Sequence, residues 1–483
     1  MKILAIDQGT TSTRALTFDE AGQYTPIASF SHAQSYPAPG RVEHDPAELL
    51  RNVRACIDAA AGLDDLAAIG LDNQGESCLA WDALTRQPVG PVIVWQDDRT
   101  RDTIARLEAS GIAELVAGRA GLPLDPYFSA SKLAWILVHN ERARDLHAAG
   151  RLRMGTTDAF FLDSLAGRFV TDVSTASRTS LMNLRSCDWD PQLCEVFGVP
   201  VETLPEIVDT TGIQGLIECG DRMIPLSAMV TDQQAALYGH GCRQPGDAKI
   251  TFGTGAFALA LTNGPACGDG RGALPTVAWR KAGASTEYAL DGGVYSASSA
   301  VNWARNLGLF SSFADISTFA NAPACSRGMF FVPALAGLAC PHWQRHARGS
   351  WFGLALDTGP GDMVQALLEG VAFRMAEVIG AMALHQEVKG PVSIDGGMSA
   401  NGYFCQFLAN CLERELIVSE QSELTALGTA LLAAEGAGQV IDAPVKGRIV
   451  SPAPLPGEYA TQFAQAREMT VRFGKSVAGN RSA

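Results

Sequence analysis

Residues 3–14 read I-L-A-I-D-Q-G-T-T-S-T-R. Residues 3–6 form an apolar run typical of a buried strand, and residues 15–18 resume an extended pattern. Asp7 and a turn of one glycine and two threonines stand at the tip of the predicted hairpin. A carboxylate can hold Mg²⁺ there, and the backbone N–H groups of such a turn can surround a phosphate. An ordinary hairpin, whose glycine and threonines only satisfy turn geometry, is the alternative interpretation of this stretch alone.

The same pattern returns in the second half of the chain. Residues 249–262 read K-I-T-F-G-T-G-A-F-A-L-A-L-T, again a strand, a Gly-Thr turn and a strand. Thr254 follows Thr10 by 244 residues in a chain of 483, which indicates an internal duplication into two similarly built domains. A turn-dense stretch at 239–246 marks the boundary, so we expect an N-terminal domain at 1–243 and a C-terminal domain at 244–483.

The composition is that of a soluble globular chain, with 47% hydrophobic and 18% charged residues. A net charge of −14 argues against a nucleic-acid partner, although metal and backbone N–H groups still allow an anion such as ATP to bind. Eleven dispersed cysteines without a C-x-x-C pair favour free thiols in a reducing compartment. No apolar run is long enough to cross a membrane, and the first strand begins at once, so we expect a cytoplasmic protein with no membrane partner.

Polar clusters follow further predicted strands. The run 67–71 ends in N-Q-G-E-S at 73–77, and the run 92–95 ends in Q-D-D-R at 96–99. We expect these strands and the first one to share a sheet whose carboxyl edge lines one cleft. Periodicity predicts helices at 46–57, 131–148, 362–386 and 425–435, and a helical tail that ends near residue 473.

Two motifs resemble nucleotide-binding signatures and fail on their context. Gly253-x-Gly255-x-x-Ala258 precedes a strand pattern, whereas a dinucleotide fingerprint must open a helix. Gly474-Lys475-Ser476 follows no buried strand and lacks the earlier glycine of a P-loop.

Three glycine turns instead favour a nucleotide laid across two domains. The first turn with Asp7 would hold Mg²⁺ and the terminal phosphates, and the turn at 253–255 would hold phosphates from the other side. The turn D-G-G at 395–397 would let the backbone approach adenosine. Asp232 opens a predicted helix just before the domain boundary, and is the best placed carboxylate to act as a base on a phosphoryl acceptor.

The chain resembles the FGGY family of carbohydrate kinases, and within it the glycerol kinases, over most of its length. The matching segments, in order, are D-Q-G-T-T-S-T-R (7–14), P-G-R-V-E-H-D-P (39–46), I-V-W-Q (93–96), D-P-Y-F-S (125–129), A-S-R-T (176–179), D-Q-Q-A-A-L (232–237), F-G-T-G (252–255), D-G-G (395–397) and T-A-L-G (425–428). The resemblance implies an α/β fold of two actin- or hexokinase-like (ribonuclease H-like) domains with ATP in the cleft between them.

The resemblance also implies roles for individual residues. Asp232 matches the catalytic base and Asp7 the carboxylate associated with Mg²⁺. The nucleotide contacts would be Thr10, Thr11, Ser12, Arg14, Gly253, Thr254, Ser298, Asn302, Gly397 and Asn401, although Ser298 and Asn302 fall where glycerol kinases carry Gly and Gln. The pocket for a small polyol or sugar would be lined by Gly75, Glu76, Trp95, Tyr127, Phe257 and Asp232. Members of the family often form homodimers or homotetramers, and no segment here specifies such a contact.

One position departs from the family pattern. Glycerol kinases read N-Q-R-E-T where this chain has Gly75 in place of the arginine. Losing that charged donor costs about 1.5–3 kcal/mol, and it would leave volume for a larger polyol or a four-carbon sugar. Alternatively, Arg99, Arg101 or ordered water replaces the donor and the substrate is glycerol itself.

Two further interpretations compete with a polyol kinase. A ketose kinase of the xylulokinase type would typically carry Met-His where this chain has Gly75-Glu76, so Glu76 favours a polyol. An ATPase of the actin fold without kinase activity is the alternative from a different class, and Asp232 beside an aromatic pocket argues against it.

Overall fold

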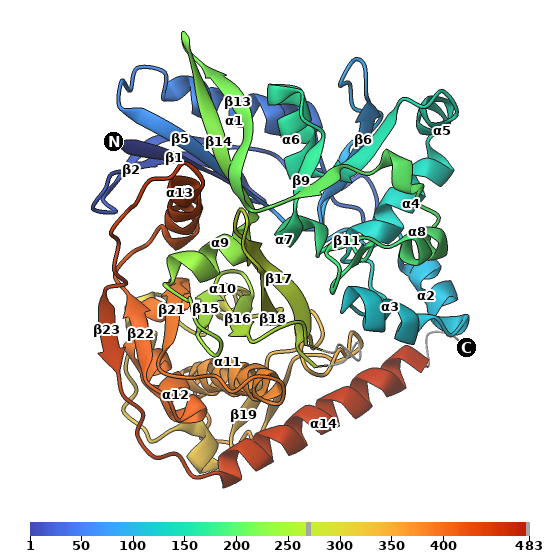
Figure 1. Ribbon diagram of the computed structural model, residues 1–483. Helices are drawn as coiled ribbons and strands as arrows, with labels where there is room; N and C mark the ends of the chain where they lie inside the picture. Colours follow the sequence, from blue (N-terminus) through green and yellow to red (C-terminus); the bar gives the residue numbers. More distant parts are fainter. Residues whose placement is uncertain (267–271, 480–483) are drawn as a thin grey trace.

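The computed structural model describes residues 1–266 and 272–479, and each half of the chain builds one large sheet (Figure 1). The N-terminal sheet has the order β13 (Thr211–Cys219), β14 (Arg222–Thr231), β5 (Leu66–Asn73), β1 (Lys2–Gln8), β2 (Ser12–Phe18) and β3 (Tyr24–Ser31). The C-terminal sheet has the order β17 (Leu274–Arg280), β18 (Thr286–Val294), β16 (Ala256–Thr262), β15 (Ala248–Phe252), β21 (Val392–Gly396), β22 (Leu416–Ser419) and β23 (Gly447–Val450).

The two sheets repeat one topology, as the duplicated sequence pattern predicts. In the N-terminal half β1 pairs antiparallel with β2 and parallel with β5, while β3 and β14 lie further out. In the C-terminal half β15 pairs antiparallel with β16 and parallel with β21, with β18 and β22 outside them. The turns at Thr10 and Thr254 therefore occupy equivalent places, each joining the central strand of a sheet to its antiparallel neighbour.

Four smaller sheets, fourteen α-helices and four short 3-10 helices complete the described part of the chain. The smaller sheets comprise β4 (Glu43–His44), β7 (Val92–Ile93), β6 (Cys78–Asp82) and β8 (Leu152–Thr156); β10 (Met182–Asn183) and β11 (Asp188–Trp189); β12 (Glu206–Val208) and β9 (Val170–Asp172); β19 (Phe330–Val332) and β20 (Ser350–Phe352). The helices are α1 (Pro46–Ala59), α2 (Arg101–Ala109), α3 (Ala113–Ala120), α4 (Ser129–His139), α5 (Glu141–Ala148), α6 (Thr157–Ala166), α7 (Val173–Ala176), α8 (Pro191–Phe197), α9 (Asp232–Gly239), α10 (Ser298–Asn306), α11 (Pro360–Ala383), α12 (Gly402–Leu412), α13 (Leu424–Gly436) and α14 (Glu458–Gly479).

Two local expectations are wrong. The run 92–95 does not join the large sheet, because only β7 forms there and it pairs antiparallel with β4 and β6. The helix expected at 131–148 is two helices, α4 and α5, that meet at Asn140. The extended backbone of Asn140 ends α4, and its side chain accepts a hydrogen bond from the N–H of Ala143 to begin α5.

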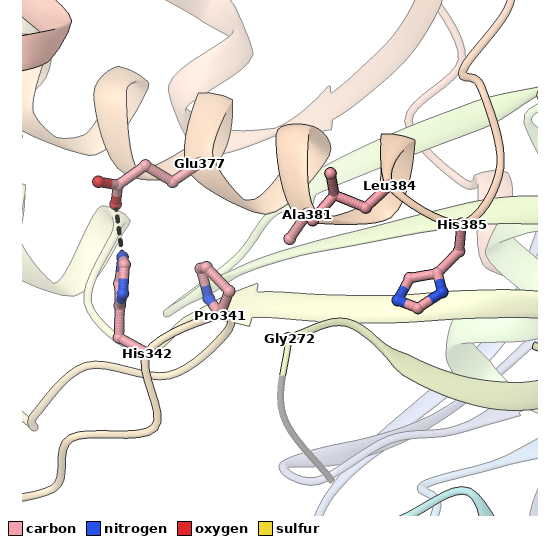
Figure 2. A pocket seen from close by; sticks show the side chains of 7 residues that line it. All are labelled: Gly272, Pro341, His342, Glu377, Ala381, Leu384 and His385. Atoms are coloured by element: carbon pink, nitrogen blue, oxygen red, sulfur yellow. Dashed lines mark hydrogen bonds and ion pairs between the residues drawn. The ribbon is translucent and has the colours of Figure 1, made fainter. Parts of the chain in front are cut away.

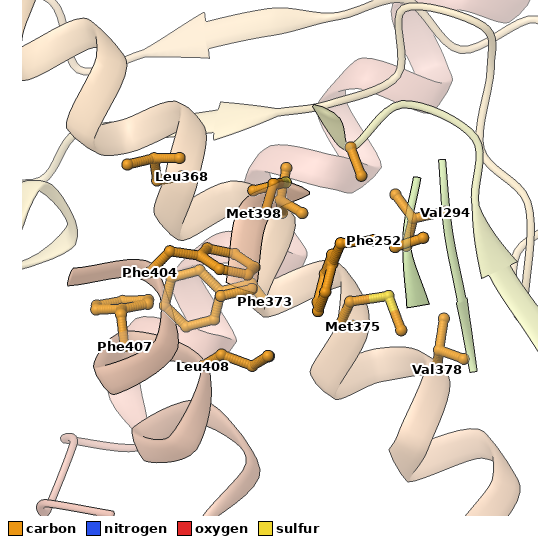
Figure 3. Packing of buried hydrophobic residues seen from close by; sticks show 14 of the residues in the cluster. Phe252, Val294, Leu368, Phe373, Met375, Val378, Met398, Phe404, Phe407 and Leu408 are labelled. Carbon is orange, nitrogen blue, oxygen red and sulfur yellow. The ribbon is translucent and has the colours of Figure 1, made fainter. Parts of the chain in front are cut away.

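The core of the C-terminal half lies where α11 and α12 cover the sheet. Phe252 of β15 packs edge-on against Phe404 of α12, and Phe373 of α11 packs against Phe407 (Figure 3). These four side chains are at most 3% exposed. Their burial anchors β15, and therefore fixes the turn that follows it at Gly253 and Thr254.

Helices α9 and α13 connect the two halves. They cross so closely that a Cβ on Gly428 would lie 1.8 Å from the carbonyl oxygen of Ala235, and one on Gly239 would lie 1.9 Å from that of Leu424. Helix α13 belongs to the C-terminal half, yet it also packs on β1, β5 and β14 of the N-terminal sheet. The T-A-L-G segment therefore ends in a glycine that the helix crossing requires.

Other expectations concern the cysteines, the tail and membrane contact. The ten cysteines in the described residues are free thiols, and Cys267 lies outside the described residues.

Gly474-Lys475-Ser476 lies inside α14, which continues beyond the expected end near residue 473. In the ranges 1–266 and 272–479, no helix combines the length and the apolar character needed to cross a bilayer.

Candidate active site

The first turn brings the predicted phosphate-binding residues to one place. The N–H of Gly9 donates to the carbonyl of Ser12 (3.0 Å), which closes the turn and leaves Thr11 exposed. Arg14 lies opposite Asp7 in the hairpin register, and its guanidinium donates to Asp7 Oδ2 at 2.6 Å. This places Asp7, Thr10, Thr11, Ser12 and Arg14 at the same end of the sheet.

A second carboxylate, which the sequence argument did not single out, lies beside Asp7. Asp72 of β5 is opposite Asp7 in the parallel register, is fully buried and accepts from Thr429 Oγ1 at 2.6 Å. Burial, together with the charge of Asp7, raises the pKa of Asp72 well above its ordinary value. Asp72 Oδ1 has no hydrogen-bond partner in the described residues, so a carboxylate oxygen is left beside the predicted metal ligand.

The second turn lies against the start of α10. The carbonyl of Thr254 accepts from the N–H groups of Ala297 (3.2 Å) and Ser299 (3.1 Å). Ser298 Oγ between them is buried without a partner in the described residues, and a Cβ on Gly397 would lie 3.9 Å from it. The structure thus brings Gly253, Thr254, Ser298 and Gly397 together, and Asn302 lies exposed one helical turn beyond Ser298.

The side chain of Asn401 makes two hydrogen bonds within the C-terminal half. Its Oδ1 accepts from the N–H of Phe404 (2.9 Å) and so caps α12, while its Nδ2 donates to the carbonyl of Ile316 (2.8 Å). These two bonds fix the orientation of the side chain and leave one acceptor position on Oδ1 and one donor hydrogen on Nδ2.

The aromatic residues of the predicted substrate pocket meet one another and the first turn. The rings of Trp95 and Tyr127 pack nearly edge-on with centroids 5.6 Å apart. Trp95 Nε1 donates to Thr10 Oγ1 at 3.1 Å. The pocket wall is therefore tied directly to the turn that would hold phosphate.

Phe257 contributes from the C-terminal sheet. It is opposite Gly293 in the β16–β18 register, and its ring occupies the space beside that glycine, where a Cβ would lie 2.9 Å from Phe257 Cδ1. Asp291 is two residues before Gly293 on β18, so its side chain is on the same face of the sheet as Phe257.

Glu76 is held in a strained and buried position. Its φ of +59° is rare for a residue with a side chain and costs about 1–2 kcal/mol. Ser129 Oγ donates to its carbonyl (2.9 Å), and Arg178 Nε donates to its Oε1 (2.6 Å). Burial raises the pKa of Glu76, while the charge of Arg178 acts in the opposite direction.

Asp232 is the first residue of α9, as the sequence predicts, and follows directly after the end of β14. Its Oδ1 accepts from the N–H of Gln233 (2.7 Å). Burial, and then the negative charges of Glu76 and Asp7, raise the pKa of Asp232 to about 7. A carboxylate with this pKa can exchange a proton with a substrate near neutral pH.

The expected volume beside Gly75 is not open. A Cβ on Gly75 would lie 2.9 Å from Thr231 Cγ2, so the methyl group of Thr231 fills this space. Neither arginine considered as a replacement donor faces the pocket. Arg99 is bound by Asp97 and Glu43, and Arg101 pairs with Asp98 on the surface.

Three charged residues of the pocket were missed as individual residues. Arg178 joins Glu76 to Asp291, and Lys132 donates to the carbonyl of Tyr127 (2.6 Å). Arg178 lies in the A-S-R-T segment, where it is a lone arginine among small, uncharged residues. This pattern could have singled it out as a candidate pocket residue. Lys132 and Asp291 carry no comparable signal, since each resembles an ordinary surface residue in sequence.

A separate pocket of about 410 Å³ lies away from these residues, between the end of α11 and the segment at 341–342 (Figure 2). Its one polar pairing among the residues drawn joins His342 to Glu377 at 3.1 Å. None of the predicted site residues lines it.

Comparison with known proteins identifies the class. Residues 2–239 match the N-terminal domain and residues 248–437 the C-terminal domain of the FGGY family of carbohydrate kinases. The chain therefore belongs to this family.

Relatives and solved structures agree with this assignment. A glycerol kinase of Alkalilimnicola ehrlichii is 43% identical over 448 residues, covering 90% of each chain, and one of Haloferax volcanii is 39% identical over 458 residues, covering 90% of this chain and 89% of the relative. The crystal structure of Plasmodium falciparum glycerol kinase with ADP superposes with a TM-score of 0.88 at 28% identity, over 97% of this chain and 98% of the other. The protein is thus an ATP-dependent phosphotransferase similar to glycerol kinases.

Proposed function

We propose that this protein transfers the γ-phosphate of ATP to a hydroxyl of glycerol or a closely related neutral polyol, with Asp232 as the general base. The observation that carries the proposal is the position of Asp232 within the fields of both Glu76 and Asp7, one from the predicted substrate pocket and one from the phosphate turn. A reacting hydroxyl must lie between these two parts of the site.

Asp232 would accept the proton of the attacking hydroxyl as the bond to phosphorus forms. Its pKa of about 7 suits it to a base that works near neutral pH. The hydrogen bond from the N–H of Gln233 fixes one carboxylate oxygen and leaves the other to face the substrate. Phosphoryl transfer depends mainly on positioning and charge neutralisation, so this fixed orientation matters as much as basicity.

The nucleotide would be held by the two glycine turns and by α10. The residues that would contact the nucleotide, through hydrogen bonds or through their backbone, are Thr10, Thr11, Ser12, Arg14, Gly253, Thr254, Ser298, Asn302 and Gly397. The unpaired Ser298 Oγ supports this placement, because a buried hydroxyl without a partner requires an explanation. For Asn401 we propose a supporting role, since its side chain caps α12.

The residues present fit a magnesium ion at the first turn. No group of three or more His, Cys, Asp or Glu side chains suited to a metal occurs in residues 1–266 and 272–479. Mg²⁺ is usually held by one or two carboxylates plus substrate phosphates, and Asp7 with the unpaired Asp72 Oδ1 supplies that donor set. When bound, the ion neutralises charge on the phosphates.

A polyol is favoured over a ketose by Glu76 and by the names of the curated relatives, which are glycerol kinases. The pocket is compact, because Thr231 fills the space beside Gly75. We also propose a division into domains at 243/244, which falls between the two matched family models.

The test is ADP release measured with a panel of glycerol, tetritols, erythrulose, xylulose and ribulose. We expect release only when a polyol is added, with the largest kcat/KM for a three- or four-carbon polyol. A preference for a ketose would replace this proposal by the ketose kinase alternative. Equal ADP release with and without any acceptor would indicate an ATPase instead.

A further inference from the structure

One buried cationic nitrogen next to the predicted substrate pocket has no hydrogen-bond partner among the residues that the structure describes. Arg178 is 4% exposed, and its guanidinium donates through Nε to Glu76 Oε1 (2.6 Å) and through Nη2 to Asp291 Oδ2 (2.8 Å). Its Nη1 makes no hydrogen bond to any residue that the structure describes. Buried donors are almost always paired, so this exception requires a ligand or water that completes it.

The unpaired group lies among the pocket residues. The guanidinium carbon is 6.0 Å from the centre of the Tyr127 ring and 5.5 Å from that of Phe128. A Cβ on Gly75 would lie 3.9 Å from Arg178 Cγ. Arg178 therefore stands next to the position at which the resembling kinases carry their arginine.

Position 75 itself offers no room for a donor. The Thr231 methyl group that fills the space beside Gly75 is fixed, because Thr231 Oγ1 lies 3.1 Å from Thr175 Oγ1 and 3.3 Å from Ser174 Oγ. The backbone N–H of Thr231 is also bound by Ser174 Oγ at 3.0 Å. Gly75 and Thr231 are thus matched to each other, and a donor must come from elsewhere.

We infer that Arg178 is the specificity-determining donor of this pocket, and that its Nη1 donates to a hydroxyl of the polyol. The inference rests on the proposed function and names the group that selects the substrate. Glu76 and Asp291 hold the guanidinium from two sides and offer acceptors for neighbouring hydroxyls. Together with Asp232, these carboxylates outnumber the two cations of the pocket, Arg178 and Lys132, so the pocket selects neutral polyols over anionic sugar acids.

The test compares the best substrate with analogues that lack one hydroxyl, for example glycerol with the propanediols. For the wild-type chain we expect kcat/KM to fall tenfold or more when the contacted hydroxyl is absent. The quantity compared is the selectivity ratio, which is kcat/KM for the best substrate divided by kcat/KM for the analogue. In Arg178→Gln this ratio should fall toward one, with the KM for ATP unchanged. A purely structural role would lower kcat/KM for substrate and analogue in parallel and leave the ratio as it was.

Two additional variants keep the test decisive. Arg178→Lys retains a positive charge between the carboxylates but cannot span three acceptors, so the ratio should also fall in this variant if Arg178→Gln does not fold. Arg99→Lys is the matched control, since Arg99 has an equally buried side chain paired with two carboxylates outside the pocket, and it should keep the wild-type ratio.

Failure of the proposed kinase function and failure of the inference about Arg178 give different results in these assays. If the wild-type chain releases ADP equally fast with and without a polyol, the proposed function fails. If it phosphorylates polyols and the folded Arg178 variants keep the wild-type ratio, this inference alone is overturned. Restoration of the ratio by Gly75→Arg with Thr231→Gly, introduced into the Arg178→Gln chain, would show that the donor has moved between the two positions.

Discussion

Asp232→Asn should remove catalysis and, at the same time, stabilise the fold at neutral and alkaline pH. The amide keeps the shape of the side chain and can still accept the hydrogen bond from Gln233 through its oxygen. It cannot take a proton from the substrate. A positioned base contributes about 10²–10⁴-fold, so we expect kcat to fall at least a hundredfold.

The effect on stability follows from the raised pKa. An unfolded aspartate has a pKa of 3.8, whereas Asp232 in the folded chain has a pKa of about 7. Between these values the folded chain holds a proton that the unfolded chain has lost, so stability falls as pH rises through this window and stays low above it. Since Asp232 is partly exposed, the penalty that Asp232→Asn relieves at pH 8.5 is between about 1 and 4 kcal/mol.

Urea unfolding of both chains at pH 5 and pH 8.5 measures this difference, and ADP release measures turnover. The gain in stability of the variant should be larger at pH 8.5 than at pH 5, and wild-type kcat/KM should rise with pH until about 7. Asp362→Asn is a control of opposite sign, because the N–H of Gly359 and the charge of Arg327 lower the pKa of Asp362. Turnover within tenfold of wild type, or equal stabilisation at both pH values, would refute the assignment of Asp232.

Three further predictions concern the helix crossing, the pocket wall and the metal. Gly428→Ala would place a methyl 1.8 Å from the carbonyl oxygen of Ala235 and should destabilise the fold by about 3 kcal/mol or more, visible in urea unfolding; an unchanged midpoint would contradict the close approach. Trp95→Phe keeps an aromatic ring but loses the hydrogen bond to Thr10, and should lower kcat/KM for ATP by about two- to tenfold. Excess EDTA should stop ADP release and added Mg²⁺ should restore it, whereas turnover that persists in EDTA would exclude the metal role of Asp7.

Features with a strong local signal were predictable from the sequence. The duplicated hairpins at Thr10 and Thr254 were predictable, because glycine turns between apolar runs depend on residues that are neighbours in sequence. The start of α9 at Asp232 was predictable for the same reason. The break at Asn140 was not, because the helical periodicity continues on both sides of it and only the local cap ends α4.

The charged part of the pocket could not be assembled from the sequence, since its pairs are distant along the chain. Arg178 bonds to Glu76 across 102 residues and to Asp291 across 113. The meaning of Gly75 depended on such contacts too. From the sequence alone, Gly75 indicates only that an arginine is missing. The structure adds that Thr231 fills the space beside Gly75 and that Arg178 is the nearby candidate donor.

The first turn also depends on the far end of the chain, which explains why residues 3–14 alone did not decide between a phosphate turn and an ordinary hairpin. Arg14, which holds Asp7, is itself held by Glu423 at 2.8 Å just before α13 begins. Asp72 is held by Thr429 of α13, which is 357 residues away. Because α13 packs on both α9 and the N-terminal sheet, it links the carboxylates of the first turn to the helix that carries Asp232. A change in the packing of α13 must therefore reach the predicted metal ligand and the predicted base together.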